Sequence, residues 1–552
     1  MQTTPASTGP VAGGVPDRHR LAAGVAVTLL AGLLILPPAG QLPLTSSDEA
    51  RFVLIARDML ERGVWFGAVV REKQYRNKPP LYPWSIAAVG QLTGGVTEFS
   101  AGLPVALAAV GSVLGTFLLG DRLFGWRTGA VAALILTTTY GFVQQTFELL
   151  PDMLVLAFVT LAGWAFWSAV VDPGRRRWMA AFWVAVGLAS FSKGPVGLLP
   201  LFPIAVWLLD AEGLRGLRRL WSAWGLALFG ALTLGWVAPF LMLGADTFGE
   251  DVVAGNWLNW YLRGSGGNRL TRFLDLIVGL LPWTLVVPLA FGRAWRQRAT
   301  PAVRFALLWS IVPILVLVVA ANWRRRYWLP IYPGVALVVA WWALVKLPLP
   351  QRLARATGWL ALAAAAAGVT SLVWAGHQPD VFLPALSWQA LPLYLAVAFL
   401  GVSMFVALHA NRPRLLVGGA VVSMLFLLSY GVWPYIRWVN RTQDFKGLAA
   451  RVEQHAGAAP IAVYGGRFFE LDYYLGRYLL RLRDVPQVQA YLARPEAPIV
   501  VVDGRAWRQL QGQLPATVQV IDTMRVRSWD MRLLRGGPPA APGESRAEAG
   551  PR

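Results

Sequence analysis

Between its first two long hydrophobic segments the chain reads Thr45-Ser-Ser-Asp48-Glu49-Ala-Arg51 and, further on, Arg71-Glu-Lys73-Gln-Tyr-Arg76-Asn-Lys78-Pro-Pro-Leu-Tyr-Pro-Trp84. This connection holds two adjacent carboxylates and a run of basic residues. The hydrophobic segments beside it recur along the chain and decide the fold class. The charges point to function, because they fall on the side of a membrane where basic residues are normally scarce.

The composition excludes a soluble enzyme. The chain has 552 residues, of which 56% are hydrophobic and 14% are charged, and it contains 27 Trp. These values are typical of a polytopic membrane protein. The net charge of +21 fits basic cytoplasmic loops and contact with anionic lipids better than nucleic-acid binding. The chain has no Cys, and its four His are far apart in the sequence, so neither residue type forms a metal-ligand spacing.

Apolar runs long enough to cross about 30 Å of hydrocarbon recur about thirteen times. We expect a disordered cytoplasmic tail over 1–20, an uncleaved first span, and a transmembrane domain over 21–436 whose outer loop, 41–98, carries amphipathic helices. The Pro-containing break at 192–195 is compatible with a tight hairpin or a kink. The expected spans are 21–40, 99–120, 128–147, 153–171, 178–192, 195–209, 221–243, 273–291, 303–320, 330–346, 357–375, 389–408 and 415–434.

The basic residues in the loops set the orientation of these spans. Lys and Arg accumulate on the cytoplasmic side of membrane proteins. This tendency predicts a cytoplasmic N-terminus and, with an odd number of spans, an outer C-terminus. The cytoplasmic loops then hold Arg175, Arg176, Arg177, Arg215, Arg218, Arg219, Arg293, Arg296, Arg298, Arg304, Lys346, Arg352, Arg355, Arg412 and Arg414.

After the last span the composition changes, and we predict a small outer α/β domain over 437–536, followed by a disordered tail over 537–552. Short β-rich runs at 461–464, 499–502 and 518–521 alternate with candidate helices at 469–475, 485–492 and 506–514. The sequence shows no internal repeat, which weakens a transporter interpretation because many transporters carry one.

Several basic residues fall on the side opposite the cytoplasmic loops. Exporting Lys and Arg opposes the orientation signal, so their number outside indicates an anionic ligand, for which phosphate is the natural candidate. The alternative is that they pair with lipid head groups or with outer acidic residues. These cations are Arg71, Lys73, Arg76, Lys78, Lys193, Arg263, Arg269, Arg272, Arg324, Arg325 and Arg326.

Two acidic pairs fall on the same side. Asp48 and Glu49 follow the first span, and Glu148 and Asp152 occupy a short turn between the third and fourth spans. Carboxylates at the mouth of an apolar bundle are costly unless they are paired or hydrated, so they are candidates for function. Helix capping is the alternative for Asp48 and for Asp152.

Phosphate-binding cations beside a carboxylate fit group transfer from a lipid phosphate. When sugar C1 is linked to a polyprenyl phosphate, the leaving group needs positive charge rather than a general acid as the bond breaks. Lys78, Arg263 and Tyr327 are candidates to supply this stabilisation. A carboxylate could then act as a base or orient the acceptor against C1.

Five motifs resemble the GT-C glycosyltransferases that use polyprenyl-phosphate sugars, above all the lipid A aminoarabinose transferases and their protein O-mannosyltransferase relatives. The resemblance covers most of the chain. It implies a GT-C bundle with a soluble periplasmic domain, and a reaction that inverts the anomeric carbon. The motifs are Asp48-Glu49-Ala-Arg51, Lys78-Pro-Pro-Leu-Tyr-Pro-Trp84, Leu150-Pro-Asp152, Ser192-Lys193-Gly-Pro195 and Arg326-Tyr327-Trp-Leu-Pro-Ile-Tyr-Pro333.

The resemblance also implies roles for particular residues. Asp48, Asp152 and Glu49 are the expected catalytic carboxylates. The residues expected to bind the donor phosphate are Lys78, Arg51, Lys193, Arg263, Arg326 and Tyr327.

A divalent metal is the one possible cofactor that the resemblance implies. Relatives often have Glu immediately before the Lys-Pro motif, whereas Asn77 stands there in this chain. Asp48 and Glu72, with Glu49, are weak candidates to bind a metal in its place.

We therefore expect a monomeric transferase of the bacterial inner membrane, with its site facing the periplasm. It would move 4-amino-4-deoxy-L-arabinose from undecaprenyl phosphate to a phosphate of lipid A, which lowers the affinity of the outer membrane for polymyxin. The alternatives are a transferase acting on protein Ser/Thr or another glycan, and a lipid transporter. A transporter would carry polar residues in mid-span, whereas here they cluster in the outer loops.

Overall fold

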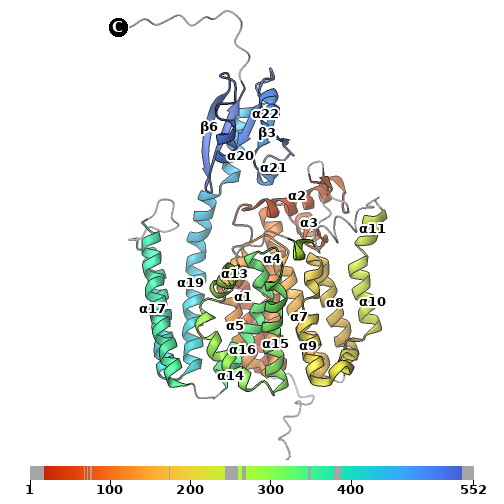
Figure 1. Cartoon of the computed structure of the whole chain (residues 1–552), viewed down its shortest axis with the longest axis vertical. Helices are drawn as coiled ribbons and strands as arrows, with labels where there is room; N and C mark the ends of the chain where they lie inside the picture. The colour runs from red at the N-terminus through yellow and green to blue at the C-terminus, as the bar shows by residue number, and fades with distance from the viewer. Residues whose placement is uncertain are drawn as a thin grey trace, which may run out of the picture. The chain divides into compact units, whose positions relative to one another are not determined.

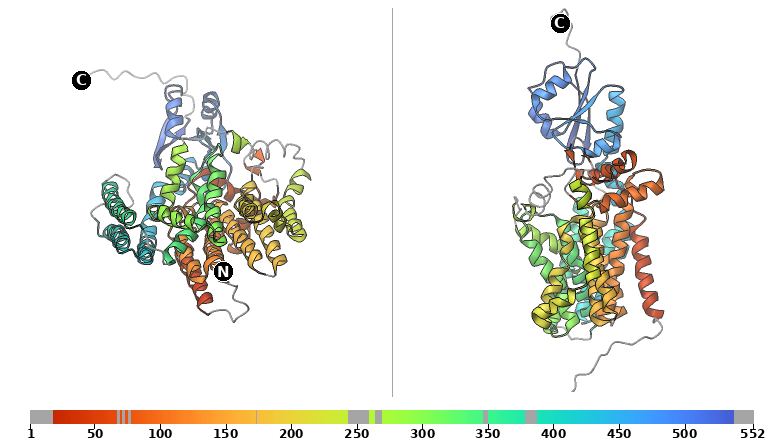
Figure 2. Two further views of the ribbon diagram at one scale, coloured as in Figure 1. Left: turned by 60° about the horizontal axis from the view of Figure 1, so that its bottom comes forward. Right: turned by 90° about the vertical axis from the view of Figure 1, so that its right-hand side faces the viewer.

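The computed structural model describes residues 18–66, 69–70, 73–74, 78–172, 174–242, 259–263, 269–345, 350–377 and 387–536. Contacts divide the chain into two units (Figures 1 and 2). The first comprises Met1–Gly40, Ala56–Val69 and Lys73–Pro434, and the second Gln41–Ile55, Val70–Glu72 and Tyr435–Arg552. Each unit is described by itself.

The first unit is a bundle of helices, which begins with α1 (Arg18–Ile35), so that the last three residues of the expected N-terminal tail are helical. Helix α2 (Ser47–Arg62) starts in the second unit and ends in the first. The following elements, most of them in the first unit, are β1 (Val69–Val70), β2 (Lys73–Gln74), α3 (Leu81–Thr93), α4 (Glu98–Phe124), α5 (Trp126–Thr137), α6 (Tyr140–Thr146), α7 (Asp152–Val171), α8 (Arg175–Lys193), η1 (Pro195–Leu198), α9 (Leu201–Glu212), η2 (Gly213–Leu220), α10 (Ala223–Leu234), α11 (Val237–Met242), α12 (Asn259–Leu262), α13 (Arg269–Gly279), η4 (Trp283–Leu285), α14 (Val287–Arg296), α15 (Pro301–Val318), η5 (Arg325–Ile331), α16 (Tyr332–Leu344), α17 (Gln351–Ala375), α18 (Leu391–His409) and α19 (Pro413–Thr442).

Nine helices among the described residues are long and apolar enough to cross a membrane. The four other expected spans also lie in helical regions, but these are interrupted or charged. The span expected at 128–147 divides into α5 and α6, and the one at 221–243 divides into α10 and α11. Helices α13 and α14, joined by η4, replace 273–291, and α8 begins with three Arg.

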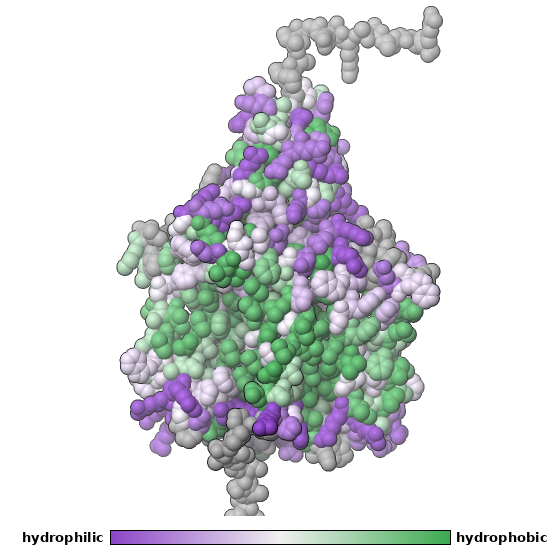
Figure 3. All heavy atoms as spheres, turned by 180° about the vertical axis from the view of Figure 1, so that it is seen from behind, coloured by the Kyte–Doolittle hydropathy of each residue, from purple (hydrophilic) through white to green (hydrophobic). Residues whose placement is uncertain are grey.

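Apolar side chains cover the outside of the first unit. On the face that Figure 3 shows, they form a broad band around its helices. Large hydrophobic side chains are exposed in the first unit, among them Leu315, Leu360 and Leu395. A soluble protein rarely exposes so continuous an apolar surface, whereas lipid covers it in a membrane protein. The expected multi-pass membrane fold is therefore confirmed.

The basic connections of the first unit meet at one end of the bundle. Arg20 of α1 pairs with Asp121 at the end of α4, and Trp167 near the end of α7 donates a hydrogen bond to the Arg122 carbonyl. Helix α7 has 20 residues and is therefore about 30 Å long. Its first residue, Asp152, lies at the end of the helix opposite the basic connections. The other contacts among these connections are Arg175 with the Arg219 carbonyl, Arg304 with Asp210, and Arg414 with the Leu344 carbonyl.

The second unit contains a five-stranded sheet in the order β4-β3-β5-β7-β6. Strand β3 pairs in parallel with β4 and β5, while β7 runs antiparallel to β5 and β6. Two of the strands, β3 and β5, coincide with expected strands. The elements are α20 (Phe445–Ala456), β3 (Ile461–Tyr464), α21 (Phe469–Tyr474), β4 (Leu480–Leu482), α22 (Val485–Leu492), β5 (Ile499–Val502), α23 (Gly504–Leu510), β6 (Gln519–Val526) and β7 (Trp529–Arg535).

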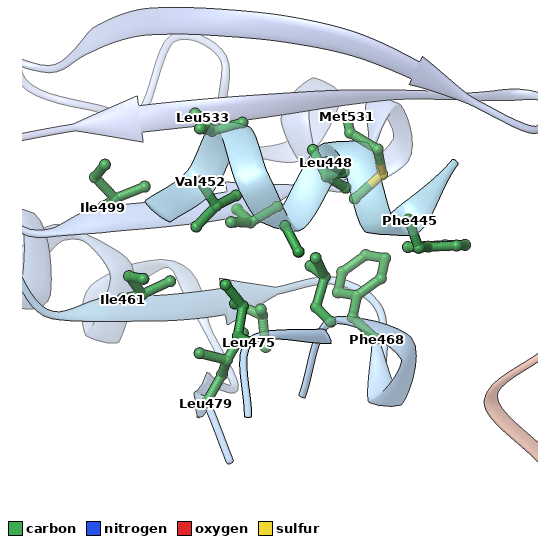
Figure 4. Close-up of a cluster of buried hydrophobic side chains, with 14 of the residues drawn as sticks. Phe445, Leu448, Val452, Ile461, Phe468, Leu475, Leu479, Ile499, Met531 and Leu533 are labelled. Atoms are coloured by element: carbon green, nitrogen blue, oxygen red, sulfur yellow. The ribbon is translucent and has the colours of Figure 1, made fainter. Parts of the chain in front are cut away.

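Side chains that alternate along the central strands fill two cores, one on each face of the sheet. Ile461 of β3 packs with Phe445 and Val452 of α20 on one face (Figure 4). The next residue, Ala462, belongs to the other core, with Val488 of α22. All four residues of β3 are buried, as are all four of β5, because helices cover both faces of this sheet.

Candidate active site

Asp152, the first residue of α7, lies at the centre of a buried group of charges in the first unit. Its side chain is 9% exposed. Lys193 Nζ donates a hydrogen bond to one carboxylate oxygen, Oδ1, and Arg326 Nε lies 3.5 Å from the other, Oδ2. The described partners of Asp152 are thus side chains from two other helical elements, and these contacts go beyond the helix capping that we considered for it. A carboxylate between two cations stays ionised and holds both cations in place.

The backbone turn after Lys193 explains how this side chain reaches Asp152. Helix α8 ends at Lys193, because Gly194 adopts φ +79° and Pro195 starts a separate 3-10 turn. The turn folds back tightly, since a Cβ on Gly197 would lie 2.1 Å from the backbone nitrogen of Ser190. The motif at 192–195 therefore separates two helices. Helices α7 and α8 pack side by side (Figure 1), which brings Lys193 to the start of α7.

Arg326 joins a second carboxylate to the group. Its Nη1 lies 3.7 Å from Glu148 Oε2, and Gln145 donates a hydrogen bond of 2.8 Å to Glu148 Oε1. Burial raises the pKa of Glu148, and the positive charge of Arg326 opposes this effect. We considered Glu148 a candidate for function but predicted no specific role for it. The signal that could have identified its role is its spacing of one helical turn from Asp152.

Tyr327 and Lys78 complete this group, which we call the cation cluster: Lys78, Lys193 and Arg326 with Asp152, Glu148 and Tyr327. Lys193 Nζ lies 4.8 Å from the centre of the Tyr327 ring. The charge of Lys78 acts on both Asp152 and Lys193. With three basic side chains and two acidic ones, the cluster has more basic than acidic groups and suits an anionic ligand.

Helix α3, which follows Lys78, is anchored beside the end of α8. Trp84 of α3 contacts Phe191 of α8 edge to face, with 5.4 Å between the ring centres. The same two rings belong to an apolar group with Trp236 and Val237. This packing explains why the Lys-Pro-Pro motif and Lys193 are close in space although they are far apart in the sequence.

Other cations that we expected on the outer side have structural partners instead. Arg272 is 3% exposed and donates hydrogen bonds to the carbonyls of Val318 and Ala320, at 2.8 and 2.6 Å. It thus caps the end of α15, where helix carbonyls lack internal partners. Arg325 pairs with Asp275 at 3.0 Å. These two arginines correct our expectation that the outer cations bind an anion.

Arg263 is not among the described contacts of the cation cluster. It follows α12, its side chain is exposed, and its carbonyl accepts a hydrogen bond from Asn322. Among the described residues, no contact joins the Arg263 guanidinium to Asp152. The predicted role of Arg263 at the donor phosphate stays a prediction.

Asp48, Glu49 and Arg51 belong to the second unit, in the first turns of α2. The Asp48 side chain is 49% exposed and accepts a hydrogen bond of 2.7 Å from Arg51, which is 15% exposed. Glu49 is 1% exposed, and its Oε2 accepts hydrogen bonds from the Thr45 N–H and hydroxyl, at 2.7 and 2.9 Å. These contacts give Glu49 a helix-capping role and make Arg51 the partner of Asp48. The catalytic role of Glu49 and the phosphate-binding role of Arg51 stay predictions. Asp48 keeps an accessible carboxylate.

The described residues do not fit a metal site. They contain no group of three or more His, Asp or Glu side chains that could hold an ion. The carboxylate of Asp48 is paired with Arg51, and that of Glu49 is occupied by Thr45. Glu72 and Asn77 lie outside the described residues.

Comparisons with known proteins agree with this architecture. The sequence model of the dolichyl-phosphate-mannose-protein mannosyltransferase family matches residues 77–242. The undecaprenyl phosphate-α-4-amino-4-deoxy-L-arabinose arabinosyl transferase of Pectobacterium carotovorum is 29% identical over 427 residues, which cover 72% of each chain.

Solved structures show the same fold. The crystal structure of ArnT from Cupriavidus metallidurans bound to undecaprenyl phosphate superposes with a TM-score of 0.72 and 20% identity, covering 97% of this chain and 100% of that one. An oligosaccharyltransferase from Archaeoglobus fulgidus superposes with a TM-score of 0.50 and 11% identity, over 88% and 69%. In sequence the chain is similar to this aminoarabinose transferase, and its fold is the GT-C membrane architecture of these solved structures.

Proposed function

We propose that this protein transfers 4-amino-4-deoxy-L-arabinose from undecaprenyl phosphate to a phosphate of lipid A, at the periplasmic face of the bacterial inner membrane. The observation that carries the proposal is the cation cluster. It gathers Lys78, Lys193 and Arg326 around Asp152 at the end of the bundle opposite the basic connections. The name of the Pectobacterium relative supports the donor and the sugar. Such a transfer adds an amine to an anionic glycolipid and so weakens the binding of polymyxin.

The position of the cluster supports the periplasmic orientation. Basic loops stay in the cytoplasm, and the basic connections near Arg122 and Arg175 lie at the other end of α7 from Asp152. The cluster therefore faces the periplasm in the proposed orientation.

The charge balance of the reaction explains why excess positive charge is needed. The C1–O bond of the donor breaks, its electron pair stays on the undecaprenyl phosphate oxygen, and an oxygen of the acceptor phosphate forms the new bond to C1. The donor phosphodiester carries one negative charge, whereas the released monoester carries about two at neutral pH. Lys78, Lys193 and Arg326 would stabilise the charge that develops on this leaving group.

The carboxylates would have different tasks. Asp152 keeps Lys193 and Arg326 close together despite their mutual repulsion, because it pairs with both. Asp48 has an accessible carboxylate that can orient the acceptor against C1. A phosphate acceptor is already ionised and needs no strong base, whereas a hydroxyl acceptor does.

Transfer of label from a synthetic undecaprenyl-phosphate sugar to extracted lipid A, by purified protein in detergent, tests the proposal. We expect transfer by the unmodified protein and a large loss in the Lys78→Ala variant. If the purified protein turned over no donor with any acceptor, the proposal would be refuted.

The match to the mannosyltransferase family model favours a second candidate, transfer to a protein hydroxyl. The Asp48→Asn variant separates the two candidates, because a hydroxyl acceptor requires a base. A mild loss of turnover favours the phosphate acceptor, while near-complete loss, with labelling of a Ser/Thr peptide by the unmodified protein, favours the hydroxyl acceptor.

A further inference from the structure

One short helix of the α/β domain contacts the chain on both sides of Asp48. Within the second unit, the Leu44 N–H donates a hydrogen bond of 3.0 Å to the Tyr474 hydroxyl, and the Ser47 hydroxyl donates one of 3.0 Å to Glu470 Oε2. Both acceptors belong to α21. The segment before Asp48 is therefore fixed to the domain at two positions, one of them the residue next to Asp48.

Helix α21 also reaches the turn after Asp48. The Arg51 guanidinium lies 5.5 Å from the centre of the Phe469 ring, while it pairs with Asp48 at 2.7 Å. Cation–ring contacts of this length are favourable, above all where water is partly excluded. The partner that directs the Asp48 carboxylate is thus itself held by the first residue of α21.

Buried charges stabilise this contact. Glu470 and Glu49 are each 1% exposed, and Arg527 Nη2 lies 3.5 Å from Glu470 Oε1. Burial raises the pKa of Glu470, and the charge of Arg527 opposes that rise. The charges of both Glu470 and Glu49 act on Arg527. The Arg527 guanidinium thus pairs with Glu470 of the domain and also interacts electrostatically with Glu49, the residue next to Asp48.

Arg527 is itself held rigidly. It lies in the turn between β6 and β7 with φ +60°, and its N–H donates to the Thr442 carbonyl at 2.6 Å. Its side-chain Nε donates to Gln443, and its guanidinium lies 5.0 and 5.3 Å from the rings of Phe445 and Trp529. A lysine would supply the charge without the planar fork that these contacts use.

We propose that Glu470 and Arg527 are positioning residues for Asp48. They fix the backbone of residues 44–51 against the α/β domain, so that the Asp48 carboxylate keeps one direction for the transfer. This inference rests on the proposed function of Asp48, and it gives the α/β domain a task in the reaction. A displacement of about 1 Å at a reacting group can cost about 100-fold in rate.

A double-mutant cycle tests whether Glu470 acts through Asp48. In the unmodified background, we expect Glu470→Gln to lower kcat about tenfold or more and to change KM for the donor by less than about twofold. In an Asp48→Ala background, which lacks the orienting group, the same substitution should change kcat by less than about twofold, because residues that act as a unit are not additive. Equal losses in both backgrounds would overturn the inference, and so would an unchanged kcat in the first.

A second, more exposed ion pair elsewhere in the domain provides a comparison. Arg451 of α20 pairs with Asp522 of β6 at 3.1 Å, so Arg451→Gln also removes one partner of an ion pair, away from residues 44–51. We expect it to leave kcat unchanged. Arg527→Lys should lower kcat less than Arg527→Gln, because it keeps the charge. A loss of kcat in Arg451→Gln as large as that in Glu470→Gln would show a merely structural effect and overturn the inference.

A readout that needs no turnover separates this inference from the proposed function. The chain has no Cys, so Asp48→Cys accepts a single nitroxide spin label. We expect an immobilised label in the full-length protein and a mobile one after Glu470→Gln is added. Equal mobility in the two proteins would overturn the inference. If no protein transferred sugar while the label still became mobile, the proposed function would fail and the attachment of residues 44–51 would stand.

Discussion

Replacing Lys193 by methionine removes one cation from the cluster and keeps most of the side chain's volume against Tyr327. The side chains of Lys193 and Asp152 are each 9% exposed. Removing one partner of such a buried pair costs about 3–5 kcal/mol, because the other charge is left uncompensated. Arg326 still lies 3.5 Å from Asp152, so we expect the lower end, about 3 kcal/mol of unfolding free energy.

The same substitution removes a positive charge from the proposed site of the leaving phosphate. Loss of one preorganised group that stabilises developing charge lowers kcat about 100- to 1000-fold. Stability and turnover can be separated with the double variant Lys193→Met/Asp152→Asn, which also removes the uncompensated carboxylate. We expect the double variant to regain most of the lost stability and none of the lost turnover.

Thermal unfolding in detergent and the labelled-donor assay measure these two quantities. The exposed Lys446 provides the control, since Lys446→Met also removes one lysine charge and should change neither quantity. If Lys193→Met unfolded at the same temperature as the unmodified protein and kept its turnover, the reasoning about the cluster would be refuted. A double variant no more stable than the single one would contradict the assigned pairing.

Three further predictions concern single positions. Lys78→Ala should lower kcat by about 100-fold or more with an unchanged unfolding temperature, because this half-buried residue supplies charge rather than core packing; full activity would remove it from the site. Burial raises the pKa of Glu148 above its ordinary value of 4.5, so the folded protein binds the proton more tightly than the unfolded chain does. The free energy of unfolding therefore falls as pH rises from 4.5 through the raised pKa. Glu148→Gln should remove this part of the pH dependence in unfolding experiments, and an identical pH profile would contradict the prediction. Arg272→Leu should destabilise the protein by about 3 kcal/mol, because buried carbonyls at the end of α15 lose their donor; an unchanged unfolding temperature would exclude the capping role.

Much of the fold was predictable because it depends on local pattern. Apolar length marked the membrane spans, and short β-branched runs marked strands β3 and β5, which lie where they were expected. The strands β4 and β7 were missed. In β4, two of three residues are exposed, and the polar residues in β7 hide its alternation. Breaks such as the one between α5 and α6 were also missed, because the sequence remains apolar through them.

The sequence by itself determined the class of the protein and the short list of candidate residues. Only the tertiary structure decided what each charge does. Arg272 and Arg326 give the same signal in sequence, yet one caps α15 and the other pairs with Asp152. Asp48 and Glu49 are adjacent, yet successive residues point about 100° apart around a helix, so one is exposed and the other buried. The role of a charged residue depends on its partners, and here most of these partners come from distant parts of the chain.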